Sequence, residues 1–245
     1  MLFYSINRVK VLKGGIGFFT QIPIGRDPES FESLRRNLWI LPIIGLISGF
    51  VIALPSYFLA LLNIEFIAVL LYILVEGINH IDGLADFGDS VFASNNKKFE
   101  ALKDTKLGSG GVIFIVFYLV ILFFSFQSIR AEIIYAIILS QVCAKTAMLV
   151  LLTTSKPLWE GLASTMMEFA SKRDLVVGVL IAILIFAFIA LHTNFRIFLV
   201  FISSIVVVVF YRAYVNKKFK GVNGDIIGAL NCIVFALSIL IFTML

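Results

Sequence analysis

Three aspartates with a regular spacing follow an apolar stretch of the sequence. Asp82, Asp86 and Asp89 belong to the ten residues from His80 to Asp89, which contain no lysine or arginine. On a helix their i, i+4 and i+7 spacing places them within an arc of about 60° on one face. Carboxylates that share a face repel one another unless a cation binds them, and carboxylate oxygens are the ligands that Mg²⁺ and Mn²⁺ prefer. The pattern predicts a metal site, with a solvated acidic helix face as the plainer alternative.

The rest of the chain has the composition of a membrane protein. Of its 245 residues 60% are hydrophobic and only 14% are charged, and the mean hydropathy is +1.04. We expect an all-α integral membrane bundle that forms a single domain, with about seven spans and six or eight as alternatives. Residues 1–37 are expected at the interface and residues 80–111 in a cytoplasmic active-site loop. The expected spans are Leu38–Leu62, Phe66–Asn79, Val112–Ile129, Ile133–Thr153, Leu175–Leu191, Ile197–Tyr211 and Ile226–Leu245.

Lysine and arginine residues alternate between the expected connections. Six precede Leu38, four lie in 80–111, three in 154–174 and four in 212–223, whereas the other connections contain one or none. Under the positive-inside rule this predicts a cytoplasmic N-terminus, an external C-terminus and aspartates that face the cytoplasm across the cell membrane. The net charge of +5 then indicates contact with the anionic membrane surface rather than with nucleic acid. A homo-oligomer is left open.

A second polar segment closes the connection that the aspartates begin. Lys103 and Lys106 flank Asp104, and Gly108 starts a glycine-rich entry to the next span. Ammonium groups and open backbone N–H groups bind phosphate oxygens, so this segment is a candidate anion site, with helix capping as the alternative. Asp225 stands at the start of the last span, where it either caps the helix or adds a carboxylate on the same side.

Three further ionisable residues lie in or beside apolar spans. Glu76 and His80 have an i, i+4 spacing, and a pair that satisfies itself and a catalytic role are both open. Lys145 is isolated in an apolar span and must reach an acid, a carbonyl or the interface.

Together these segments resemble the cobalamin synthase family, also called adenosylcobinamide-GDP ribazoletransferase. His80–Asp89 is similar to the family's His-x-Asp-Gly-x-Ala-Asp-x-x-Asp segment, and the resemblance extends along nearly the whole chain. Further similar segments follow in the family's order, namely Phe19–Pro23, Leu41–Gly45, Lys103–Gly108 and Gly224–Ala229.

The chain departs from the family pattern at several positions. Gln21 and Lys106 stand where the family usually has arginine, which weakens any bidentate grip on phosphate there. Ala144, with Lys145 beside it, also replaces an arginine. The remaining departures are Cys232, where the family usually has glutamate, and Ser90, where it has glycine.

The resemblance implies a late step of cobalamin biosynthesis. The family joins adenosylcobinamide-GDP to α-ribazole, or to its 5′-phosphate, and releases GMP. The resemblance also implies Mg²⁺, with Mn²⁺ as an alternative, bound by Asp82, Asp86 and Asp89. Asp89, which lies furthest along the segment, is the expected general base, and His80 is a further catalytic candidate. The implied substrate and phosphate contacts are Lys103, Asp104, Lys106, Gly108 and Asp225.

Two other functions remain open from the residues alone. CDP-alcohol phosphotransferases also present aspartates to Mg²⁺ from an Asp-Gly-x-x-Ala segment, but here Ala85 falls one residue early. A cation transporter or channel is expected to place carboxylates near mid-membrane in two related halves. Here the aspartates follow the end of a span and no repeat is evident. Product formation distinguishes the two enzymes, and ion flux tests the transporter.

Overall fold

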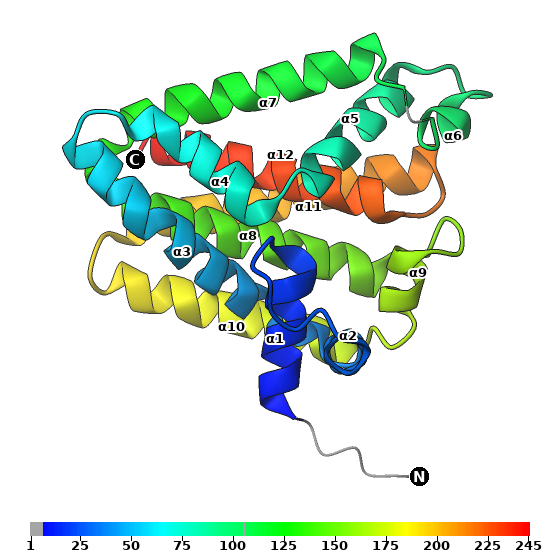
Figure 1. Cartoon of the computed structure of the whole chain (residues 1–245), viewed down its shortest axis with the longest axis horizontal. Coiled ribbons are helices and arrows are strands. Elements are labelled where there is room, and N and C mark those ends of the chain that lie inside the picture. The colour runs from blue at the N-terminus through cyan, green and yellow to red at the C-terminus, as the bar shows by residue number, and fades with distance from the viewer. Residues whose placement is uncertain (1–6, 105) are drawn as a thin grey trace.

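Long apolar helices make up most of the protein. The computed structural model describes residues 7–104 and 106–245, and Figure 1 shows their helices side by side in one bundle. Among them α8 is the most enclosed. In its apolar 18-residue segment 83% is buried inside the molecule, against 28% in that of α10. The predicted all-α membrane bundle is confirmed. Six helical segments are long and apolar enough to cross a membrane: Leu38–Leu61, which ends in α3 (Leu41–Leu61), α7 (Ser109–Ser128), α8 (Ile133–Thr154), α10 (Lys172–Ala190), Phe195–Lys218, which contains α11 (Phe198–Lys218), and α12 (Gly224–Phe242).

The second predicted span ends at a bend. The predicted segment Phe66–Asn79 is helical to the end of α4 (Ala68–Glu76), and the chain then turns by 95° into α5 (Asn79–Phe92). Gly77 between them has a φ of +83°, a conformation that strains any residue with a side chain. Counted as one crossing, the bent pair brings the number of spans to seven.

The predicted loop over residues 80–111 is largely helical. It contains most of α5 and the short helix α6 (Lys98–Ala101), and it ends in the first turn of α7. α5 forms because its apolar side chains, including Leu84 and Phe87, are buried on one face while its aspartates lie on the other.

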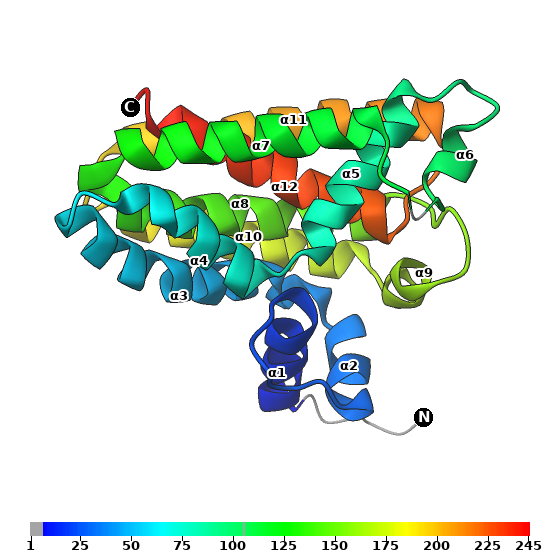
Figure 2. The ribbon, with the colours of Figure 1, turned by 45° about the horizontal axis from the view of Figure 1, so that its top comes forward.

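The N-terminal segment supports the bend between α4 and α5. It forms α1 (Arg8–Phe19) and α2 (Pro28–Arg35), which lie together on one side of the bundle (Figure 2). Just after α1, the backbone N–H of Gln21 donates to the carbonyl of Val75 at 2.7 Å. A Cβ added at Gly77 would lie 2.2 Å from Nε2 of Gln21, but that side chain is flexible, so the turn needs glycine chiefly for its conformation. Of the predicted interfacial segment, residues 1–6 lie outside the described residues.

The last helix, α12, positions α5 from the other side. A Cβ added at Gly83 would lie 2.8 Å from Cα of Asp225, and one added at Gly228 would lie 3.3 Å from Cα of His80. Glycine at these positions therefore lets the two helix backbones approach closely, as small residues do between membrane helices. The contact places the first turn of α12 beside the aspartates of α5.

Candidate active site

The three aspartates of the acidic segment all lie on α5, at one end of the bundle. Asp82 is exposed, whereas Asp86 and Asp89 are partly buried. The first turn of α12 brings Asp225 to the same place, and none of these four carboxylates forms an ion pair with a described residue. The predicted helix and the predicted return of a carboxylate by Asp225 are therefore present in the structure.

Asp89 has a structural partner that sequence reasoning missed. Its Oδ2 accepts the N–H of Gly108 and its Oδ1 accepts the N–H of Gly111, each at 2.8 Å, so the carboxylate caps the N-terminus of α7. The predicted general base therefore has both oxygens engaged, and two of the N–H groups predicted to bind phosphate donate to a protein carboxylate instead. A signal was present in the sequence, because a glycine-rich helix entry needs an acceptor, but spacing alone does not show which acid supplies it.

Asp86 lies where negative charge accumulates. It is on the part of α5 that is level with the first turns of α7 and α12. The carboxylates of Asp225, Asp82 and Asp89 all act on it electrostatically. Asp225 is partly satisfied, because its Oδ2 accepts from Nδ2 of Asn223 at 2.6 Å. A cation would relieve the repulsion among these groups.

The donor set suits a hard divalent cation that also binds substrate. In the described part of the chain no three acidic, histidine or cysteine side chains converge into a complete ligand set. Mg²⁺ typically takes only one or two carboxylates and fills its octahedral sphere with water and substrate phosphates. Asp82 and Asp86, one helical turn apart and without a cationic partner, fit that role.

A pocket of about 510 Å³ opens beside these carboxylates. It is lined by His80 and Asp82 of α5 and by Asp225 of α12. The opposite wall comes from the end of α1 and from α9 (Leu162–Met167), with Phe18, Leu162 and Met166 among its residues. Sequence reasoning missed this wall because its segments are far apart in the chain. The pocket gives a substrate access to the carboxylates.

His80 is not a self-satisfied partner of Glu76. Its Nε2 lies 3.9 Å from Oε2 of Glu76, too far for a hydrogen bond, and has no hydrogen-bond partner among the described residues. His80 lines the pocket, while this nitrogen is itself buried.

Of the three partners left open for Lys145, an acid, a carbonyl or the interface, the structure shows an acid inside the bundle. The side chain is fully buried, and its ammonium donates to Glu76 and, at 3.0 Å, to Oδ1 of Asn231. Two departures from the family pattern are completely buried next to these residues in the sequence: Ala144 precedes Lys145, and Cys232 follows Asn231. Asn231 was not singled out from the sequence, since a lone amide in an apolar span gives no spacing signal.

The lysine segment lies at the same end of the bundle. Lys103 and Lys106 are both exposed, and Nζ of Lys103 is 4.7 Å from the centroid of the Trp159 ring. The backbone N–H of Lys106 donates to Oδ1 of Asp104 at 3.1 Å, which makes a local turn. Thr105 lies outside the described residues. The structure leaves both ammonium groups open to solvent at the carboxylate end.

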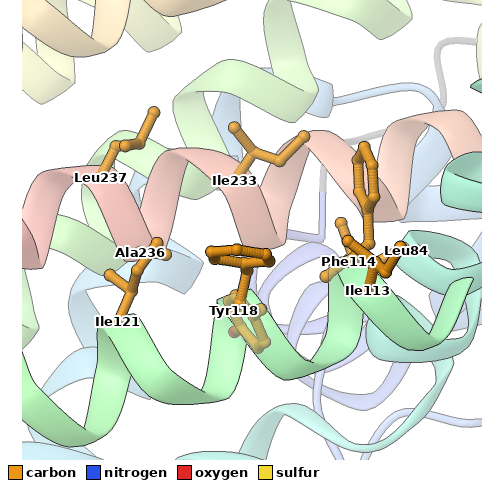
Figure 3. Close-up of a pocket in the computed structure, with 9 residues that line it drawn as sticks. Leu84, Ile113, Phe114, Tyr118, Ile121, Ile233, Ala236 and Leu237 are labelled. Carbon is orange, nitrogen blue, oxygen red and sulfur yellow. The ribbon is translucent and has the colours of Figure 1, made fainter. Parts of the chain in front are cut away.

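An apolar groove away from the aspartates cannot be the active site. It lies between α7 and α12 and has a volume of about 250 Å³. Figure 3 shows its apolar lining, which includes Phe114, Ile233 and Leu237. Its one polar side chain is Tyr118, and it contains none of the aspartates, so it has no groups for phosphoryl chemistry.

The sequence is similar to known proteins along almost its whole length. The model of the cobalamin-5-phosphate synthase family matches residues 12–243. A protein of Archaeoglobus fulgidus named adenosylcobinamide-GDP ribazoletransferase is 46% identical over 231 residues, which cover 94% of this chain and 96% of that protein. A second protein of that name and organism is 38% identical over the same shares. One of the same name from Methanococcoides burtonii is 30% identical over 95% of this chain and 91% of its own. No solved structure matches.

These comparisons favour neither the CDP-alcohol phosphotransferase nor the transporter interpretation. The matched range contains the segments that first suggested the family, and three of them, His80–Asp89, Lys103–Gly108 and Gly224–Ala229, lie at one end of the bundle. The chain belongs to the cobalamin-5-phosphate synthase family.

Proposed function

We propose that this protein joins adenosylcobinamide-GDP to α-ribazole, or to its 5′-phosphate, and releases GMP. A ribose hydroxyl attacks the phosphoryl group next to the cobinamide arm, a new P–O bond forms, and the pyrophosphate bond to GMP breaks. The observation that carries this proposal is a pocket bordered by Asp82 and Asp225, next to Asp86, in which these carboxylates lack a cationic partner among the described residues. The names of the relatives support the same reaction.

Asp82 and Asp86 would hold Mg²⁺, or Mn²⁺ in its place. When bound, the cation neutralises charge on the pyrophosphate oxygens of the substrate. Asp225 is our candidate for the general base, because it lines the pocket and only its Oδ2 is hydrogen-bonded within the described chain. It would take the proton of the attacking hydroxyl at Oδ1, a role that we first expected of Asp89.

Two other groups would position the donor substrate. Lys103 and Lys106 are exposed at the carboxylate end, where their ammonium groups can reach phosphate oxygens from solvent. His80 lines the pocket and would bind a substrate oxygen there through its ring as a neutral donor or acceptor.

Reconstitution of the reaction tests this function. Purified protein is incubated with Mg²⁺, adenosylcobinamide-GDP and α-ribazole, and GMP and the complete corrinoid are separated by chromatography. We expect the two products in equal amounts. Asp82→Asn serves as the matched control, because it keeps the side-chain volume and removes the charge. Release of GMP without a corrinoid product, or no turnover with either acceptor, contradicts the proposal.

The carboxylate end of the bundle would face the cytoplasm. The connections at this end contain most of the lysine and arginine residues, which favours that orientation in the cell membrane. Asp104→Cys and Lys217→Cys, each in a chain whose two native cysteines are replaced by alanine, test it. A membrane-impermeant maleimide should label both positions only after the cells are opened. Labelling in intact cells reverses the assignment.

A further inference from the structure

We propose that a second pocket, between α1 and α2, binds the acceptor nucleoside and that Arg26 binds its 5′-phosphate. This inference rests on the proposed function and deepens it. The second pocket has a volume of about 390 Å³ and is lined by Gly17, Phe18, Arg26, Phe31 and Leu162 among other residues. Three of these, Gly17, Phe18 and Leu162, also line the carboxylate pocket, so the two pockets adjoin across a shared wall.

The walls of the second pocket suit a planar apolar group. The rings of Phe18 and Phe31 lie 5.3 Å apart at 37°, and Leu162, Pro28 and glycine backbone complete most of the lining. The base of α-ribazole is a dimethylbenzimidazole, which is flat, apolar and has one free ring nitrogen. Guanine has several donors and acceptors that would be left unpaired here, and the corrin ring is too large. The base of the acceptor is therefore the part of either substrate that fits.

Arg26 places a guanidinium group at this pocket. One terminal nitrogen donates to the carbonyl of Gln21 at 3.1 Å, and Arg26 forms no ion pair with a described residue. The neighbouring acid, Asp27, also lines the pocket. Its carboxylate instead accepts from the backbone N–H of Ser30 at 2.9 Å and from the Ser30 hydroxyl at 2.7 Å. The guanidinium therefore keeps N–H donors in the planar arrangement that binds phosphate.

The arrangement assigns the two ends of one nucleoside. The reacting hydroxyl would lie in the carboxylate pocket, near Asp225, while the base and the 5′-phosphate extend past Phe18 and Leu162 into the second pocket. Arg26 would then discriminate between the two forms of the acceptor, because only the phosphorylated form has a group for it to bind. The expected preference is for α-ribazole 5′-phosphate.

Acceptor kinetics test the assignment of Arg26. The full chain is assayed with Mg²⁺ and saturating adenosylcobinamide-GDP, while either α-ribazole or its 5′-phosphate is varied. Arg26→Gln should raise the KM for the 5′-phosphate about 10- to 100-fold and change the KM for α-ribazole by less than about twofold. Arg8→Gln, which removes an exposed charge of α1 outside the pocket, should change neither value. Equal effects of Arg26→Gln on both acceptors, or no effect, overturn the assignment.

A second variant tests the apolar part of the pocket. Phe31→Leu keeps an apolar side chain but removes the ring, so it should raise the KM for both acceptors several-fold and leave the KM for adenosylcobinamide-GDP unchanged. An increase in the donor KM alone contradicts the placement of the acceptor base. Failure of the wild-type chain to use either acceptor refutes the proposed function as well. Normal turnover with no change in either variant refutes the pocket assignment only.

Discussion

The buried carboxylate of Glu76 and the carboxylates at the end of the bundle differ in whether the protein neutralises their charge. In the interior, Oε2 of Glu76 accepts a hydrogen bond from the ammonium group of Lys145, which neutralises its charge. The same oxygen accepts from Nδ2 of Asn231 at 3.4 Å. At the end of the bundle Asp82 and Asp86 have no such cation among the described residues. A charge that is neutralised within the chain is part of the fold, and loss of its partner is costly because a buried charge is then left uncompensated. Charge left without a partner beside a pocket is available to a ligand, and this difference separates structural acids from candidate functional ones.

Removal of the unpaired carboxylate charges at the end of the bundle should have the largest effect on activity. Asp82→Asn and Asp86→Asn should each lower turnover by at least ~100-fold, because each would remove a ligand of the proposed cation. Thermal unfolding in detergent should be unchanged or shifted slightly upward, since repulsion among the carboxylates decreases. EDTA should abolish the activity of the wild-type protein. Product formation in EDTA, or near-normal rates in both variants, refutes the metal role.

Removal of the interior cation should instead affect stability. Lys145→Met leaves the Glu76 carboxylate buried without a cation and should lower the free energy of unfolding by about 3–5 kcal/mol. The double variant Glu76→Gln/Lys145→Met should recover most of that loss. Both values are measured by thermal unfolding in detergent. If the double variant is as unstable as the single one, the uncompensated charge of Glu76 is not the cause of the lost stability.

The exposed lysines should affect substrate use without changing the metal requirement. Lys103→Ala and Lys106→Ala should each lower kcat/KM about 10- to 100-fold, since a charge-assisted contact with phosphate is lost. The Mg²⁺ concentration for half-maximal activity should stay the same. Lys97→Ala, an exposed lysine in the same connection, is the control. Identical kinetics for all three variants would mean that the lysine segment only connects helices.

A variant of Asp89 tests whether this carboxylate is a structural helix cap or a metal ligand. As a cap of α7 it should tolerate Asn better than a metal ligand does, because an amide oxygen still accepts one of the two N–H groups. Asp89→Asn should lower the free energy of unfolding by about 1 kcal/mol and leave the Mg²⁺ dependence of activity unchanged. A large rise in the Mg²⁺ requirement would return Asp89 to the set of metal ligands.

Sequence reasoning succeeded where periodicity or the cost of a buried charge decides the structure. It found the long apolar helices, the common helix of Asp82, Asp86 and Asp89, and the need of Lys145 for a polar partner, of which an acid was one alternative. It missed the bend at Gly77, because hydropathy averages over an apolar run and does not register one residue with positive φ. Such a bend depends on tertiary partners that no local window contains.

The same limit explains the incomplete description of the site. The capping of α7 by Asp89 joins residues on two helices, and spacing within one segment does not reveal it. The pocket wall formed by Phe18 and Leu162 was missed for a similar reason, since α1 and α9 are distant in the chain. Resemblance to a family located the segments, but it did not show how they meet.

The supports of α5 also set an order for assembly. Gln21, made early in synthesis, holds the carbonyl of Val75 at the bend, whereas Asp225 and Gly228, made near the end, form the surface on which α5 packs. A nascent chain that has inserted every helix before α12 therefore still lacks Asp225 and the part of the pocket lining that α12 supplies. Under the proposed function, such a chain has no general base until its last helix is in place.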